Sequence, residues 1–552
     1  MKVGKGITFT LLVLAGAIQA LAICSPFDGV SRGWLQIICL SLLISVIDYG
    51  KKQKPKNVIG QVVVQTSYKS IFGKALVFAT SWLSTTFWWI YISLHNYGGM
   101  PALLALASVV VLALGLSLYY ASVCTLYAYL SKQGKWGLDG VLFGSLWTIA
   151  ELARAQWFTG FPWGAIGYAH IDNSLKFIAP YVGLYGIGFV AAFLAFNLSM
   201  LCSSIWEAFK GDKQKIRFIT IGMNLLFCLL IWPNQKVISE IERFNNQNIN
   251  LTQVLNYSLL QGNVPQEIKF EEEGLKAINW YKNQILRADT QLIVTPETAI
   301  PVLEVNLPPG YWQEITEHIE TKSRQEQALL MGIIGESGGQ YSNRVVGISV
   351  NKPNYIYDKH HLVPFGEFIP AWFKWFTDLI KIPLGSFSRG NLTQGPWETI
   401  GQSIAVNVCY EDVFGEELAV AFVTKGEKVP TLMVNVSNIG WFGPFMAVEQ
   451  HLNASRMRAI EMGRPMLRAT NTGATAAIDH NGYVKSMLPK STKGVLTGEI
   501  QGVVGSATPY AQWSGRYSLY PLWGTCLAIV LFMLGLNLKR KNSSRFERRG
   551  GK

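Results

Sequence analysis

Residues 404–412, with the sequence IAVNVCYED, show what kind of fold the polar half of this chain adopts. The run IAVNV is short and mostly apolar, with two β-branched valines and an isoleucine, which is typical of a buried strand. Cys409 follows as the strand ends, and Tyr410 and Glu411 come next. Because α/β folds build their sites at strand ends, this stretch predicts both a sheet and a functional site.

The same pattern extends over the surrounding chain. Further strands are predicted at residues 252–261, 291–295, 328–334, 343–350, 403–409 and 431–436. Helices are predicted at residues 270–286, 311–327 and 445–462, each with its charges gathered toward one side. Strands that alternate with helices indicate an α/β domain, and residues 233–514 are long enough to bury a core of their own.

Cys409 is the only cysteine of this polar segment. The other six lie in strongly apolar runs, where a free cysteine acts as a small hydrophobic residue: Cys24, Cys39, Cys124, Cys202, Cys228 and Cys526. A lone thiol is either buried and inert or a nucleophile. Glu297 and Lys359 also follow short apolar strands, so a carboxylate, an ammonium and a thiol at three strand ends suggest acyl-transfer chemistry.

The rest of the chain has the composition of a membrane protein. Hydrophobic residues make up 49% and charged residues 15% of the 552 residues, and the mean hydropathy is +0.22. Eight apolar runs are predicted to span a bilayer: residues 6–27, 33–47, two runs within 75–131, 140–157, 177–206, 218–232 and 517–538. We therefore predict a membrane domain at 1–232, a polar domain at 233–514, and an eighth span with a basic tail at 515–552.

The positive charge lies beside the apolar runs. Residues 233–514 contain 23 Lys and Arg against 27 Asp and Glu, whereas the rest of the chain contains 25 against 8. This argues against nucleic acid as a partner, because the large polar domain is mildly acidic. Lysines and arginines gather on the cytoplasmic side of membranes, so both termini are predicted to be cytoplasmic and residues 233–514 to lie outside the cytoplasm.

Two features of the apolar runs leave alternatives open. Ala20-Leu21-Ala22 resembles a signal-peptidase site, but the first run is longer than a signal core, so an uncleaved span is favoured. Glu151 and Arg154 lie three residues apart inside the fifth run and are predicted to pair in the bundle interior. A structural ion pair is favoured there over a contact with substrate.

Several short motifs resemble a known family. Thr295-Pro296-Glu297, Lys359 within residues 357–367 and Cys409-Tyr410-Glu411 resemble the Glu-Lys-Cys segments of the nitrilase superfamily. More narrowly, the chain is similar to the bacterial apolipoprotein N-acyltransferase family. Four segments carry the closer likeness: 359–367 (KHHLVPFGE), 93–101 (SLHNYGGMP), 160–163 (GFPW) and 456–465 (RMRAIEMGRP).

The resemblance implies an α-β-β-α sandwich joined to a membrane domain of eight helices. It implies that Cys409 takes an acyl chain from a phospholipid as a thioester and passes it to the N-terminal amine of a diacylglyceryl-cysteine lipoprotein. Glu297 is then the base and Lys359 stabilises the oxyanion, with Glu367, Tyr410 and Glu411 in support. The location implied is the bacterial inner membrane, with the catalytic domain in the periplasm.

Aromatic residues near these motifs are predicted to meet lipid. Residues 365–384 contain Trp372 and Trp375 among other apolar side chains, and an arm that dips into the membrane interface is favoured over a buried helix. Trp441 and Phe442 are predicted to form a second lipid-binding edge. Phe270 and Ile439 occupy positions where the family pattern has Trp and Asp, so no role is assigned to them.

No cofactor is expected, because the chain has neither a metal-binding spacing of His and Cys nor a glycine-rich phosphate loop.

Two other functions compete with acyl transfer. A transporter with an extracytoplasmic sensory domain is disfavoured because only one pair of ionisable residues lies within an apolar run. A membrane-tethered amidase or nitrile hydrolase would use the same three residues with water as the acceptor.

Overall fold

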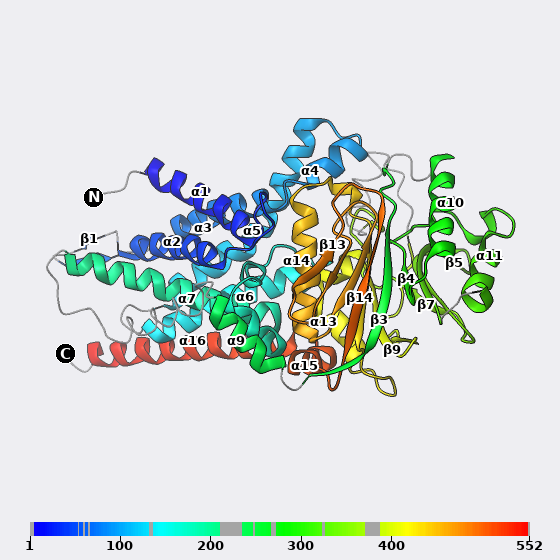
Figure 1. Cartoon of the computed structure of the whole chain (residues 1–552). Helices are drawn as coiled ribbons and strands as arrows, with labels where there is room; N and C mark the ends of the chain where they lie inside the picture. The colour runs from blue at the N-terminus through cyan, green and yellow to red at the C-terminus, as the bar shows by residue number, and fades with distance from the viewer. Residues whose placement is uncertain are drawn as a thin grey trace.

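The computed structural model describes residues 5–52, 55–58, 61–64, 67–131, 136–209, 235–246, 249–266, 272–322, 326–369 and 387–549. It has two parts, a layer of long helices and a sheet-containing domain, which pack against each other (Figure 1). The strands of the sheet-containing domain are β3 and those that follow it in the chain. A separate short hairpin of β1 (Pro55–Val58) and β2 (Gln61–Val64) lies in the helical half.

Two six-stranded sheets form the sheet-containing domain. One has the order β14-β3-β4-β5-β6-β7 and the other β13-β12-β11-β10-β9-β8. The strands of the first are β14 (Gly494–Val504), β3 (Asn250–Gln261), β4 (Leu292–Val294), β5 (Ala328–Ser337), β6 (Gln340–Ser349) and β7 (Tyr355–Asp358). Those of the second are β13 (Val484–Met487), β12 (Ala476–Ile478), β11 (Met466–Thr470), β10 (Leu432–Ser437), β9 (Gln402–Val408) and β8 (Trp397–Thr399).

The sheets pack face to face because alternate residues on each strand are apolar and point inward. On β9 these are Ile404, Val406 and Val408, and they share one core with Leu292 and Val294 of β4. All six predicted strands are confirmed, with ends that move by up to three residues. Short strands such as β11 and β12, which no sequence pattern indicated, complete the second sheet.

Helices cover the outer face of each sheet. α10 (Glu272–Arg287) and α11 (Tyr311–Glu317) share a core with the outward side chains of β4 and β5. On the other sheet α14 (Met446–Met462) packs outside β10 and β11, and its core continues into the membrane helices. The domain is therefore a sandwich with one outer layer that is also an interface with the helical half.

α14 is almost entirely buried between the sheet and the helical half. Of its 17 residues, 15 are buried. Arg458 and Glu461 lie 3.0 Å apart and face α7 (Ala179–Phe209), where a Glu461 oxygen accepts the Leu184 N–H at 2.6 Å. A helix with neighbours on both faces has no solvated side. The charges of Arg458 and Glu461 are therefore paired at the interface between the sheet-containing domain and the helical half.

Seven of the eight predicted spans fall on helices, and residues 218–232 lie outside the described residues. The helices are α1 (Lys5–Ile23), α2 (Gly33–Lys52), α3 (Tyr68–Thr86), α5 (Ala102–Leu130), α6 (Trp136–Gln156), α7 and α16 (Tyr520–Arg549). By length and composition, four segments of the described chain can cross a membrane, namely 6–23, 102–130, 174–206 and 520–538. A fifth is added if α3 and the helix that follows it, bent by 61°, form one span, so the count of eight is not confirmed.

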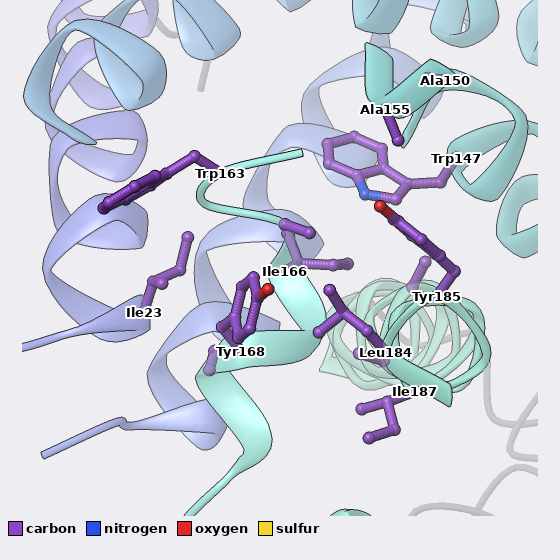
Figure 2. Close-up of a cluster of buried hydrophobic side chains, with 14 of the residues drawn as sticks. Ile23, Trp147, Ala150, Ala155, Trp163, Ile166, Tyr168, Leu184, Tyr185 and Ile187 are labelled. Carbon is purple, nitrogen blue, oxygen red and sulfur yellow. The ribbon is translucent and has the colours of Figure 1, made fainter. Parts of the chain in front are cut away.

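Glu151 and Arg154 do not form the predicted ion pair. Both are buried, but within the described residues they bond to the loop that follows α6 and not to each other. Glu151 accepts the Ile166 N–H at 2.9 Å, and Arg154 donates to the carbonyls of Phe161 and Trp163 at 2.7 and 2.6 Å. The two charges therefore anchor this loop, whose Trp163 and Tyr168 lie among side chains of α1, α6 and α7 (Figure 2).

Candidate active site

Glu297, Lys359 and Cys409 meet at one edge of the sandwich. Glu297 lies three residues beyond β4, and Lys359 and Cys409 directly follow β7 and β9. β4 and β7 belong to one sheet and β9 to the other, so the two sheets together bring the three residues into one place. The structure places the three residues close together, and the chemical role of each remains a prediction.

Two glycines allow the backbone to approach closely at this edge. A Cβ at Gly332 of β5 would lie 2.3 Å from the Pro296 carbonyl oxygen, next to Glu297. A Cβ at Gly390 would lie 2.0 Å from the backbone carbonyl oxygen of Asp358, next to Lys359. Both distances are far inside van der Waals contact, so only glycine fits beside the segments that carry the carboxylate and the ammonium.

Lys359 is fully buried between two carboxylates. Its Nζ donates to Glu297 Oε1 at 3.1 Å and to Glu367 Oε1 at 2.9 Å. Asn343 of β6 donates to the same two oxygens, at 2.6 and 2.7 Å. Burial opposes the charged form, but the two carboxylates outweigh it and raise the pKa of Lys359 above its ordinary value. The site therefore contains a permanent buried cation.

Cys409 has a left-handed backbone, with φ of 52°, and its residue is only partly buried. Burial of the thiol, followed by the charge of Glu297, raises the pKa of Cys409 to about 12. Lys359 and the backbone N–H of Asn438 act in the opposite direction. That N–H also donates to Glu297 Oε2 at 2.7 Å, which places the carboxylate beside the sulfur. A neutral thiol beside a carboxylate is the arrangement that general-base activation requires.

Two of the predicted supporting residues connect the loops of the site. The second oxygen of Glu367 accepts the Val363 N–H at 2.7 Å, so Glu367 joins the loop after Lys359 to the ammonium itself. Glu411 accepts the N–H groups of Val408 and His360, each at 2.6 Å, and thereby connects the Cys409 and Lys359 segments. Burial raises the pKa of Glu411 to about 7.

Tyr410, the third predicted supporting residue, faces the helical half. Its hydroxyl donates to the Gly160 carbonyl at 3.3 Å, and its ring stacks on Trp163 with a centroid distance of 6.4 Å. Its side chain thus joins the nucleophile segment to the loop after α6.

Trp441 and Phe442 contact the bend that follows α3. Trp441 packs on Tyr97 at 5.3 Å and Phe442 on Trp89 at 4.5 Å between ring centroids. Trp441 remains 39% exposed, so part of its ring is open to a ligand or to lipid. Trp372, Trp375 and Phe270 lie outside the described residues, and Ile439 is a buried member of the core shared with the helical half.

The sequence analysis missed a buried polar network behind Cys409. Asn407, Asn435 and Arg468 lie at matching register positions on β9, β10 and β11, facing α14. Each interrupts an otherwise apolar strand, and this common interruption is the signal that could have identified them. Asn343 and Asn438, which contact Glu297, were likewise not predicted.

The fold and the site define a nitrilase-like domain of the carbon-nitrogen hydrolase class. Residues 259–509 match the family described as "Carbon-nitrogen hydrolase", and residues 15–197 match the "Apolipoprotein N-acyltransferase N-terminal domain". Both matches lie within the predicted polar and membrane domains.

Curated relatives identify the family more closely. A protein named apolipoprotein N-acyltransferase from Verminephrobacter eiseniae is 42% identical over 525 residues, which cover 92% of each chain. One of the same name from Ralstonia nicotianae is 37% identical over 507 residues, covering 91% of this chain and 89% of the relative. The chain belongs to the apolipoprotein N-acyltransferase family and is an acyltransferase, as the motifs predicted.

The raised pKa of Cys409 predicts an unusual alkylation profile. With a pKa of about 12, the thiolate fraction grows about tenfold for each pH unit between pH 7 and 10. An ordinary thiol, with a pKa of about 8.5, levels off within this range. We expect the rate of iodoacetamide alkylation at Cys409, followed by peptide mass spectrometry, to rise throughout.

Glu297→Gln removes a negative charge that raises the thiol pKa, so the variant should be alkylated faster at pH 8. Glu398→Gln, which alters a surface pair with Lys428, is the matched control and should behave as the parent chain does. A plateau near pH 9 in the parent chain, or slower alkylation of Glu297→Gln, would contradict this description of the site.

Proposed function

We propose that this chain transfers an acyl chain from a phospholipid to the N-terminal amine of a diacylglyceryl-cysteine lipoprotein, through a thioester on Cys409. The observation that carries the proposal is the position of Cys409, a residue that is only partly buried, beside the buried pair of Lys359 and Glu297. The domain that holds them packs directly on helices apolar enough to cross a membrane. The names of the relatives support the same acceptor chemistry.

The first step forms the thioester. The Cys409 thiol proton passes to the Glu297 carboxylate as the sulfur attacks the ester carbonyl of the phospholipid. The oxyanion formed is stabilised by the Lys359 ammonium and the Tyr410 backbone N–H, and one well-placed donor contributes about 3 to 4 kcal/mol. The intermediate then expels the glycerol oxygen, which takes the proton from Glu297 and leaves as a lysophospholipid.

The second step consumes the thioester. The lipoprotein amine attacks the thioester carbonyl, and Glu297 removes a proton from the nitrogen. The same donors stabilise the second oxyanion, and its collapse releases the Cys409 sulfur, which recovers its proton from Glu297. The sequence from ester to thioester to amide ends in the most stable acyl derivative, so no nucleotide is consumed.

Both substrates carry acyl chains, so the site must open toward lipid. Trp441 and Phe445 are 39% and 51% exposed, and Phe445 packs on Trp88 with centroids 5.4 Å apart. These rings, with Phe442, form an aromatic edge between the catalytic domain and the bend after α3. We assign this edge to acyl-chain binding, together with Trp372 and Trp375 of the predicted arm.

We place the protein in the inner membrane with the catalytic domain in the periplasm, on the basis of the basic residues that flank the apolar runs. Val305 is 83% exposed on the catalytic domain, so a Val305→Cys variant should react with a membrane-impermeant maleimide in cells with a permeabilised outer membrane. A cysteine added after Lys552 should react only after lysis. The opposite result would reverse the proposed orientation.

Acyl transfer is tested by incubating the purified protein with a phospholipid labelled in its acyl chain and a diacylglyceryl lipopeptide. We expect the label to appear in an amide on the lipopeptide, and Cys409→Ala to abolish it. Release of free fatty acid without amide formation would instead support the hydrolase alternative. Equal amide formation by Cys409→Ala would refute the nucleophile assignment.

A further inference from the structure

The carbonyl oxygen of Cys409 is held by two buried donors. His451 Nε2 lies 3.0 Å from this oxygen, and Asn435 Nδ2 donates to it at 3.4 Å. His451 comes from α14 and Asn435 from β10, so the sheet and its covering helix both contribute. Both residues are at most 1% exposed, and neither takes part in the acyl-transfer steps described above.

Arg468 determines which nitrogen of His451 carries the proton. Its Nη2 donates to His451 Nδ1 at 2.6 Å, so Nδ1 is an acceptor and Nε2 carries the hydrogen that reaches Cys409. The other end of the guanidinium donates to Ser455 Oγ at 2.6 Å and to Asp412 Oδ2 at 3.3 Å. Burial and the Arg468 charge lower the pKa of His451, so the ring is neutral.

A residue of the helical half also contacts the His451 ring. Trp163 stacks on His451 with centroids 5.4 Å apart and an interplanar angle of 19°. The Trp163 indole N–H donates to Gln450, the neighbour of His451 on α14, at 2.7 Å. The loop that carries Trp163 is anchored in turn by Arg154 of α6, which donates to the Trp163 carbonyl.

The direction of the Cys409 carbonyl also sets the direction of the Tyr410 N–H, which belongs to the same peptide group. The peptide that joins Cys409 to Tyr410 is planar and trans, so its N–H points opposite to its C=O. Tyr410 is the second residue of the short helix Cys409–Val413, in the first turn, where an N–H has no partner within the helix. Holding the carbonyl toward His451 therefore turns the Tyr410 N–H away from the network.

We propose that His451 is a positioning residue that aims the Tyr410 N–H at the oxyanion, by holding the carbonyl of the preceding peptide. Arg468 fixes its tautomer and Trp163 fixes its ring plane, so the helical half contributes to the catalytic geometry. This inference rests on the proposed thioester chemistry. It predicts a selective defect, because the oxyanion donor matters for attack on an ester and is irrelevant to simple alkylation of the thiol.

The experiment compares two rates at Cys409 in full-length protein in detergent. One is the formation of hydroxylamine-sensitive label from an acyl-labelled phospholipid, and the other is alkylation by iodoacetamide. His451→Phe keeps an aromatic ring against Trp163 but removes the donor, whereas His451→Gln keeps an N–H donor and loses the ring. His318→Phe, on the helical turn His318–Lys322 outside the first sheet, is the matched control.

We expect His451→Phe to slow acylation at least 30-fold while alkylation stays within about twofold of the parent chain, since loss of one oxyanion donor costs roughly 100-fold or more. His451→Gln should recover acylation to within about fivefold, and His318→Phe should change neither rate. Unchanged acylation in His451→Phe, or equal loss of both rates, would overturn the inference. If His451→Phe fails to fold, His451→Gln alone decides: slow acylation with normal alkylation refutes the positioning role. Absence of label on the parent chain would refute the proposed function itself.

Discussion

The buried charge of Lys359 is the constraint on which the rest of the site depends. An ammonium without solvent exposure is tolerated only when partners surround it, and removing one partner of a buried pair typically costs about 3 to 5 kcal/mol. Glu297 and Glu367 supply those partners, and the amide of Asn343 donates to the same two carboxylate oxygens. The tight backbone contacts at Gly332 and Gly390 follow from the need to bring the segments that carry these residues together.

The same charge shapes the chemistry at Cys409. The resting site combines two carboxylates, an ammonium and a neutral thiol, and Glu297 is the carboxylate that lies beside the sulfur. In the proposed mechanism the thiol proton moves to Glu297, and the negative charge passes to the sulfur and then to the ester oxygen. Lys359 would stabilise this charge at each stage.

The membrane half is structurally continuous with the catalytic half. α14 packs on the outer face of one sheet and on the membrane helices at the same time, and both contribute to one core. Trp163 extends this contact to the residues beside the nucleophile. Such an arrangement holds the thiol at a fixed place relative to the helices, as the proposed transfer of an acyl chain from a membrane lipid would require.

Sequence patterns predicted six strands of the two large sheets and the positions of Glu297, Lys359 and Cys409 at strand ends, because buried strands and the residues at their ends are local features. The network of Asn407, Asn435, Arg468 and His451 depends on register between strands and on packing of α14, which are non-local. Glu151 and Arg154 were expected to pair because they lie one turn apart, but Glu151 accepts a loop N–H and Arg154 donates to loop carbonyls and to the Tyr120 hydroxyl instead. The span count exceeded what the described helices support, since hydropathy alone does not separate shorter apolar helices such as α2 from full spans.

The most direct test of this account is mass spectrometry of the purified protein after brief exposure to a phospholipid of defined acyl chains, without an amine acceptor. The account predicts that the peptide containing Cys409 gains the mass of one acyl group with loss of one hydrogen, and that hydroxylamine removes it. An acyl group found on another residue, or an unmodified Cys409 in protein that still produces lysophospholipid, would contradict the account.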